Sequence, residues 1–130
     1  YAKTINIEAL TMIDMAKKQI VPATIKYQTS LAESVNAIKA ASSAVDTSVQ
    51  EALMADISTN LKDMYVALAH LEEVAGKAEA MEEGAEQGHY YHDVVFTAMD
   101  ELRAPIDKLE MLVDKSMWPM PSYGDLLFEV

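Results

Sequence analysis

The chain contains no cysteine among its 130 residues. This absence excludes disulfide bonds, zinc sites built from thiolates and catalysis by a thiol nucleophile. A chain of this length buries roughly two thirds of its unfolded surface without such cross-links, so we expect one domain, residues 1–130. The lack of cysteine fits a reducing compartment, and we expect a cytoplasmic location.

Long apolar runs are also missing. No segment approaches the roughly 20 apolar residues of a transmembrane helix, and the N-terminus lacks the charged-then-apolar order of a signal peptide. We therefore expect a soluble chain without a membrane partner. Because it begins at Tyr1 and not at a methionine, we expect a fragment of a longer protein.

Basic residues are few: ten Lys and Arg stand against 21 Asp and Glu, a formal net charge of −11. Binding of nucleic acid needs a basic surface, so we expect no nucleic-acid partner. The charge is uneven, because residues 1–41 carry five lysines and three acids whereas the rest is strongly acidic. We expect this asymmetry to help assembly and solubility more than stability.

Glycine is scarce as well. Gly76, Gly84, Gly88 and Gly124 are isolated, so no glycine-rich loop exists to hold a phosphate. No serine or threonine stands in a glycine-flanked nucleophile elbow. The sequence therefore predicts no catalytic residue.

What the chain does contain is helical periodicity. Apolar residues recur every three or four positions in three segments, about residues 6–41, 47–80 and 87–116. The expected core positions are Leu10, Ile13, Ile20, Thr24, Tyr27, Leu31, Val35 and Ile38, then Val49, Leu53, Ile57, Leu61, Met64, Leu68, Leu71, Ala75 and Ala78, then Tyr91, Val95, Ala98, Leu102, Ile106, Leu109, Leu112 and Val113. We predict an all-α fold, an antiparallel up-down-up bundle of three long helices.

Local signals place the ends and bends of these helices. Asn6 is a candidate N-cap of the first helix, and Thr47 with Gln50 has the form of a capping box before the second. Pro22 and Pro105 fall inside the first and third patterns. Since each apolar stripe resumes beyond its proline, we expect two kinked helices and not broken ones.

The tail, residues 117–130, cannot continue the third helix because Pro119 and Pro121 interrupt it. We expect it to be ordered and non-helical. Its candidate docking residues are aromatic or aliphatic: Trp118, Tyr123, Leu126, Leu127 and Phe128. They would either close the open side of their own bundle or dock on a neighbouring domain or subunit.

Histidines offer the only weak site candidates. Glu86 and His89 have the spacing of one di-iron ligand pair, with His92 one turn further, but no second such pair exists and we predict no metal site. His70 could be a phosphoacceptor, yet Leu71 follows it where phosphotransfer modules carry a Lys-Gly pair. These residues support an alternative function, a freestanding acidic helical module for signalling or partner binding.

Several longer segments carry a family resemblance. They are residues 5–10 (INIEAL), 20–23 (IVPA), 35–40 (VNAIKA), 103–115 (RAPIDKLEMLVDK) and 118–128 (WPMPSYGDLLF). Together they resemble the C-terminal part of type III glutamine synthetases over essentially the whole chain. Met120 and Ser122 depart mildly from the Phe and Thr usual in that family.

The resemblance implies a large oligomeric bacterial enzyme that joins ammonia to glutamate using ATP and magnesium. In that family the residues that bind metal, nucleotide and glutamate lie in an upstream catalytic domain, so none is carried onto this chain. The implied role is a non-catalytic helical C-terminal domain. Its expected partners are the upstream catalytic domain and other subunits of a homo-oligomer.

Overall fold

The computed structural model describes residues 2–120, and within this range it is helical without any strand. The elements are α1 (Ala2–Met15), η1 (Ala16–Ile20), α2 (Val21–Ala41), α3 (Ser48–Ala80), α4 (Ala85–Tyr90), η2 (Tyr91–Val95) and α5 (Phe96–Leu112). They join into three continuous helical passes, residues 2–41, 48–80 and 85–112. The all-α prediction with three helices is confirmed.

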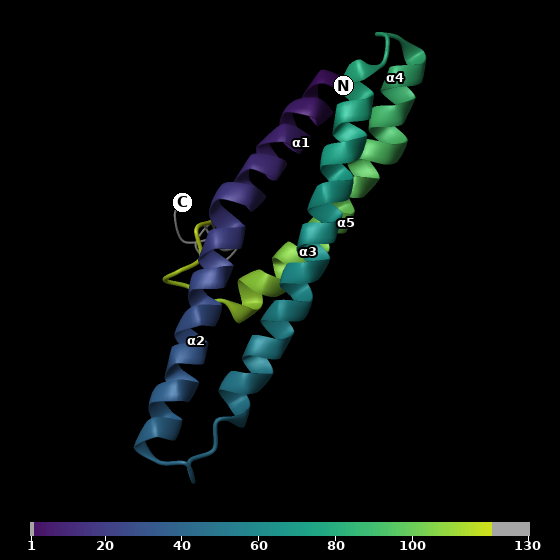
Figure 1. Ribbon diagram of the computed structural model, residues 1–130. Helices are drawn as coiled ribbons and strands as arrows, with labels where there is room; N and C mark the ends of the chain where they lie inside the picture. The colour runs from purple at the N-terminus through teal and green to yellow at the C-terminus, as the bar shows by residue number, and fades with distance from the viewer. Residues whose placement is uncertain (1, 121–130) are drawn as a thin grey trace.

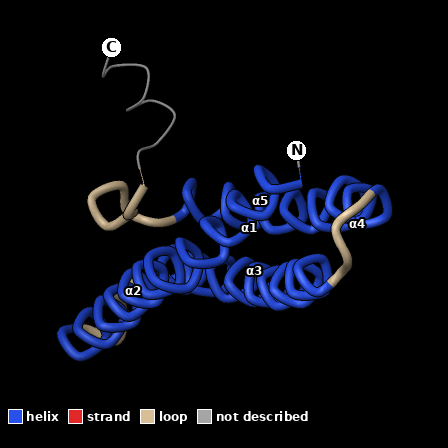
Figure 2. The backbone as a smooth tube through the Cα atoms, turned by 90° about the horizontal axis from the view of Figure 1, so that it is seen from above, coloured by secondary structure: helices blue, strands red, loops and turns tan. Residues whose placement is uncertain are grey.

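Figure 1 shows α1 and α2 descending along one side, α3 returning, and α4 to α5 descending again beside α3. α3 packs against α5 and α2, and α1 packs against α3 and α5. α5 ends before it reaches the lower end of α3, so the lowest part of the helical fold has two helices only. We call α2 and residues 48–62 of α3 the two-helix arm, and the other helical residues the three-helix body. Seen from above, the arm extends to one side of the body (Figure 2).

The core lies mainly in the three-helix body. Its buried apolar residues are Ile5, Ala9, Met12, Ala16, Ile20, Met64, Leu68, Leu71, Val74, Ala75, Ala78, Tyr91, Val95, Ala98, Met99, Leu102 and Leu109. The helical part of the arm buries only Thr24, Leu31 and Ile57 to the same degree. A third helix is therefore what completes the core.

Two π turns set which residues face this core. In η1 the N–H of Val21 bonds to the carbonyl of Ala16, and in η2 the N–H of Phe96 bonds to the carbonyl of Tyr91. Each bond spans five residues instead of four, so each turn holds an extra residue and shifts the phase of the helix. η1 ends two residues before Pro22, which has no N–H to donate.

Two predicted core positions are wrong. Leu10 is 45% exposed and Val49 is 70% exposed. In α1 the buried positions are Ile5, Ala9 and Met12, and Leu10 lies on a different side of the helix. The predicted apolar stripe assumed regular α-helical spacing along the whole first pass, and it matches the buried side of α2. The extra residue in the π turn rotates α1 relative to that stripe, so Leu10 no longer faces the core.

The predicted helix starts also differ from the structure. The first pass begins at Ala2, and Asn6 lies inside α1, so Asn6 is not its N-cap. Thr47 precedes α3 but makes no capping bond; its hydroxyl donates to Glu51 Oε2 at 3.0 Å. The carboxylate of Asp46 accepts the N–H of Ser48 at 2.8 Å instead, so the capping box with Gln50 is wrong.

The third pass ends at Leu112, before the predicted residue 116. Val113 is extended, and Asp114 Oδ1 accepts hydrogen bonds from the N–H and the hydroxyl of Ser116, both at 2.8 Å. An aspartate that bonds the backbone two residues ahead favours a turn over a helix. This turn redirects the chain toward Trp118.

Trp118 is 9% exposed and belongs to the hydrophobic core, with Met117 and Met120 packed partly against it. The other candidate docking residues, Tyr123, Leu126, Leu127 and Phe128, lie outside the described residues. Within the described stretch, no helix has both the length and the apolar character needed to cross a bilayer.

Candidate functional site

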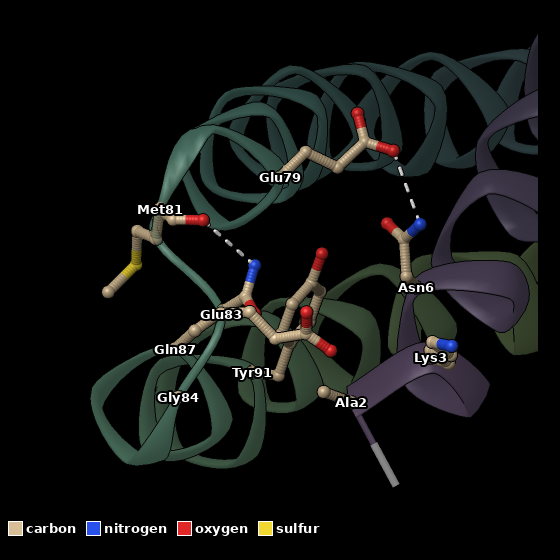
Figure 3. Close-up of a pocket in the computed structure, with 9 residues that line it drawn as sticks. All are labelled: Ala2, Lys3, Asn6, Glu79, Met81, Glu83, Gly84, Gln87 and Tyr91. Atoms are coloured by element: carbon tan, nitrogen blue, oxygen red, sulfur yellow. Dashed lines mark hydrogen bonds between the residues drawn. The ribbon is translucent and has the colours of Figure 1, made fainter.

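A polar pocket of about 540 Å³ lies at one end of the three-helix body (Figure 3). The start of α1, the end of α3 and the α3–α4 connection meet there with α4 and η2. The lining residues are Ala2, Lys3, Asn6, Glu79, Met81, Glu83, Gly84, Gln87 and Tyr91. The pocket is thus placed where all three passes come together.

Gln87 closes the α3–α4 connection at this pocket. Its side-chain amide donates to the carbonyl of Ala78 at 2.9 Å and to that of Met81 at 3.2 Å. The last carbonyls of a helix have no partner within the helix, and Gln87 supplies one. Gly84 has a φ of 155°, a conformation that side-chain-bearing residues rarely adopt, and it allows the reversal.

The pocket also links the first pass to the second. Asn6 Nδ2 donates to Glu79 Oε1 at 3.2 Å. Asn6 Oδ1 is buried and has no hydrogen-bond partner among the described residues. Burial raises the pKa of Tyr91, and the nearby charge of Glu79 raises it further, so its phenol stays protonated. The pocket is thus lined by carboxylates, the ammonium group of Lys3, side-chain amides and a neutral phenol, a set suited to binding polar groups and tying helices together.

The residues of the histidine cluster lie at the surface. Glu86 and His89 lie in α4 and His92 in η2, and all three side chains are exposed. His92 Nδ1 lies 2.8 Å from Asp93 Oδ1, its neighbour in sequence. Within residues 2–120, no group of three or more His, Asp or Glu side chains is placed to hold a metal ion.

His70 lies exposed on α3, beside a shallow hollow between α3 and α5. The hollow is lined by Asp63, Val66, Ala67, His70 and Glu101. The carboxylates on both helices make this surface acidic, so a phosphate group would meet like charge there.

Two further hollows lie along the first pass. One, of about 450 Å³, is the α1–α5 groove, lined by Ile7, Glu8, Thr11, Met12, Met15, Met99, Arg103, Ile106 and Asp107. The other, of about 390 Å³, is lined by Lys18, Gln19, Pro22, Ala23, Lys26, Met117 and Pro119. Sequence reasoning found neither the groove nor Gln87. The only signal for the groove was the set of methionines at helical spacing.

Comparison with known proteins gives these features a context. Residues 1–39 match the family described as glutamine synthetase C-terminal domain. The glutamine synthetase of Butyrivibrio fibrisolvens is 31% identical over 130 residues, all of this chain and 19% of that protein. The glutamine synthetase of Bacteroides fragilis is 30% identical over 98% of this chain and 18% of that protein.

A third relative carries the subtype in its name. The type-3 glutamine synthetase of Dictyostelium discoideum is 26% identical over 98% of this chain and 18% of that protein. The chain therefore spans about a fifth of the length of the curated relatives it matches. The resemblance seen in the sequence is confirmed: over nearly its whole length the chain is similar to glutamine synthetases, one of them named type-3, and its first 39 residues match the glutamine synthetase C-terminal domain.

Proposed function

We propose that this chain is the non-catalytic C-terminal helical domain of a type III glutamine synthetase, and that it supports the catalytic domain or the assembly of subunits. The observation that carries this proposal is the similarity of nearly the whole chain to about a fifth of three glutamine synthetases. In this proposal the parent enzyme joins ammonia to glutamate with ATP and magnesium in the cytoplasm. Both cofactors bind in the upstream catalytic domain.

We further propose that the three passes act as an up-down-up brace, bent at Pro22 and Pro105. A proline inside a helix removes one backbone bond and pushes the axis aside. The π turn that precedes Pro22 supports a bend at that point. Such a brace would present a shaped surface to the rest of the enzyme.

The exposed apolar residues support a role in packing against partners. Ile25, Val49, Tyr65 and Val66 are each exposed by 47% or more. Exposed apolar surface of this kind favours contact with another protein surface. We propose that the partners are the catalytic domain and other subunits of a homo-oligomer.

The experiment compares the parent enzyme with a form lacking residues 1–130. For the shortened enzyme we expect light scattering to show a smaller assembly, and we expect a lower rate of glutamine formation. Residues 1–130 alone, supplied with glutamate, ammonia, ATP and magnesium, should form no glutamine. A shortened parent with full mass and full activity would refute the supporting role, and glutamine formation by residues 1–130 would refute the non-catalytic one.

A further inference from the structure

The polar pocket at the end of the three-helix body has a buried wall that carries a hydroxyl group. Tyr91 is only 3% exposed, yet it lines the pocket, and Figure 3 shows its hydroxyl directed toward the side where Asn6 and Glu79 lie. Within residues 2–120 this hydroxyl makes no hydrogen bond. Buried tyrosines usually give their hydroxyl a partner, because an unpaired polar group in the interior costs free energy. A ligand in the pocket would supply that partner.

The charges around this hydroxyl favour a cation. The pocket is lined by two carboxylates, Glu79 and Glu83, and by one ammonium group, that of Lys3, so one negative charge is in excess. Burial is the main cause of the raised pKa of Tyr91, and the charge of Glu79 is the second cause. The phenol is therefore neutral and lies in a negative potential, where its oxygen can accept a hydrogen bond from a cation.

Asn6 holds the carboxylate of Glu79 at this wall. Its Nδ2 donates to Glu79 Oε1 at 3.2 Å, and this bond fixes the orientation of the amide because an ionised carboxylate can only accept. Asn6 Oδ1 is covered by protein and receives no donor from the described residues. The wall thus has more acceptors than donors. A positively charged group with several N–H donors fits such a wall better than a carboxylate or a phosphate does.

The size of the pocket and its apolar lining describe the rest of the ligand. The volume of about 540 Å³ lies within the range of roughly 300–1,000 Å³ that is usual for small-molecule pockets. Ala2 and Met81 add apolar surface to the lining. An ammonium ion alone would leave this surface to water, whereas a short alkyl chain would cover it.

We propose that this pocket binds a small primary amine in its ammonium form. The ammonium group donates to the Tyr91 hydroxyl and to the carboxylate of Glu79, and the alkyl chain lies against Met81. Lys3 is exposed and lines the same pocket, so its own ammonium group competes for the carboxylates. The site is independent of the proposed function, because it needs neither catalysis nor contact between subunits.

Nuclear magnetic resonance of the isotope-labelled chain, residues 1–130, tests the site at the side-chain amides of Asn6 and Gln87, which both line the pocket. The terminal amine is acetylated so that it cannot compete. We expect propylammonium to shift these signals along a saturating curve. Tetramethylammonium has the same charge without an N–H, and propanol has no charge, so each should bind roughly fivefold more weakly or less tightly still.

Variants locate the bound ammonium group. Tyr91→Phe keeps the buried ring and removes the hydroxyl, and Glu79→Gln removes the charge, so each should weaken propylammonium binding roughly fivefold. Lys3→Met removes the competing ammonium group and should strengthen binding roughly twofold to fivefold. Glu86→Gln, at an exposed position of α4 that does not line the pocket, is the matched charge control and should leave the affinity unchanged.

Each other outcome overturns the proposal. Equal binding of tetramethylammonium, or equal weakening by Glu86→Gln and Glu79→Gln, would show a general attraction of cations to the acidic surface. Binding of propionate that is lost in Lys3→Met would show that the pocket takes anions. If circular dichroism shows that Tyr91→Phe loses helix, Glu79→Gln and Lys3→Met decide instead, since both positions are exposed. An enzyme that assembles without residues 1–130 would leave these titrations unchanged, so the two proposals fail separately.

Discussion

The three-helix body and the two-helix arm are built from the same helical passes but differ in what covers them. In the body, α1, α3 and α5 surround side chains that are almost completely buried, such as Leu68, Leu71 and Leu102. In the arm, α2 packs against α3 without the cover that α5 gives the body, and Leu53 and Leu61 are half-buried. A pair of helices leaves two open sides, whereas a third helix closes one of them.

The comparison shows where stability resides. Burial of apolar area is the main favourable term in folding, and the body has far more of it per residue. The arm has instead a few polar contacts across its interface, such as that between Gln28 Nε2 and Ser58 Oγ at 2.6 Å. We therefore expect the body to hold the fold and the arm to open more easily.

The largest effect should come from matched leucine truncations. Leu68 is 1% exposed in the body, and Leu68→Ala should lower the free energy of unfolding by about 3 kcal/mol because it leaves a cavity. Leu53→Ala in the arm should cost about 1 kcal/mol, since that side chain is half-buried. Urea unfolding monitored by circular dichroism measures both. Equal losses would show that the arm is as well packed as the body.

A second substitution should stabilise the junction of the two regions. Thr24 is completely buried, and its hydroxyl has no hydrogen-bond partner among the described residues. Thr24→Val keeps the shape and removes the unpaired group, so stability should rise by about 1 kcal/mol. Thr29→Val, at an exposed position of the same helix, is the control and should change little. A loss of stability in Thr24→Val would mean that the hydroxyl has a partner.

Smaller effects should distinguish the polar contacts of the two regions. Lys17 Nζ and Glu72 Oε2 form a 2.7 Å ion pair in the body, with side chains 49% and 38% exposed. A double-mutant cycle with Lys17→Gln and Glu72→Gln should give a coupling of about 0.5 kcal/mol. In concentrated salt this coupling should shrink, whereas the coupling of Gln28 and Ser58 should persist. A salt-independent Lys17–Glu72 coupling would exclude a mainly electrostatic contact.

The smallest effect concerns acid. The hydrogen bonds from Ser48 to Asp46, with Lys39 nearby, lower the pKa of Asp46. A carboxyl with a lowered pKa in the folded state stabilises the fold above its ordinary pKa, and this contribution is lost as the pH falls through the lowered value. The melting temperature of Asp46→Ala should therefore be lower than that of the unaltered chain at neutral pH and converge with it in acid. A constant difference across the pH range would rule out this linkage.

Much of the helical content could be predicted from the sequence because apolar periodicity reports burial directly. The predicted first and second helices end where the structure ends them, at Ala41 and Ala80. Ile20, Ile57, Leu68 and Leu102 were all expected in the core and are buried. Some of these positions lie in stretches with regular α-helical spacing. At the others, the π turn brings the apolar residues back to the side of the helix that faces the core.

The remainder depends on contacts that no short pattern encodes. The π turn η1 moved Leu10 out of the core, and the turn at Asp114 shortened the third pass. The hydrogen bonds of Gln87 join residues from two passes, so only the assembled fold reveals them. The likeness to glutamine synthetases came from longer segments of sequence and not from any site chemistry.

Gln87 has a consequence for how the molecule would respond to acidification. The turn at the arm tip is held by the carboxylate of Asp46, which takes up a proton as the pH falls. The opposite turn, between α3 and α4, is held by the amide of Gln87, which does not titrate in this range. In acid the hydrogen bond at the Asp46 turn would therefore weaken, whereas the two hydrogen bonds that Gln87 donates at the α3–α4 turn would not.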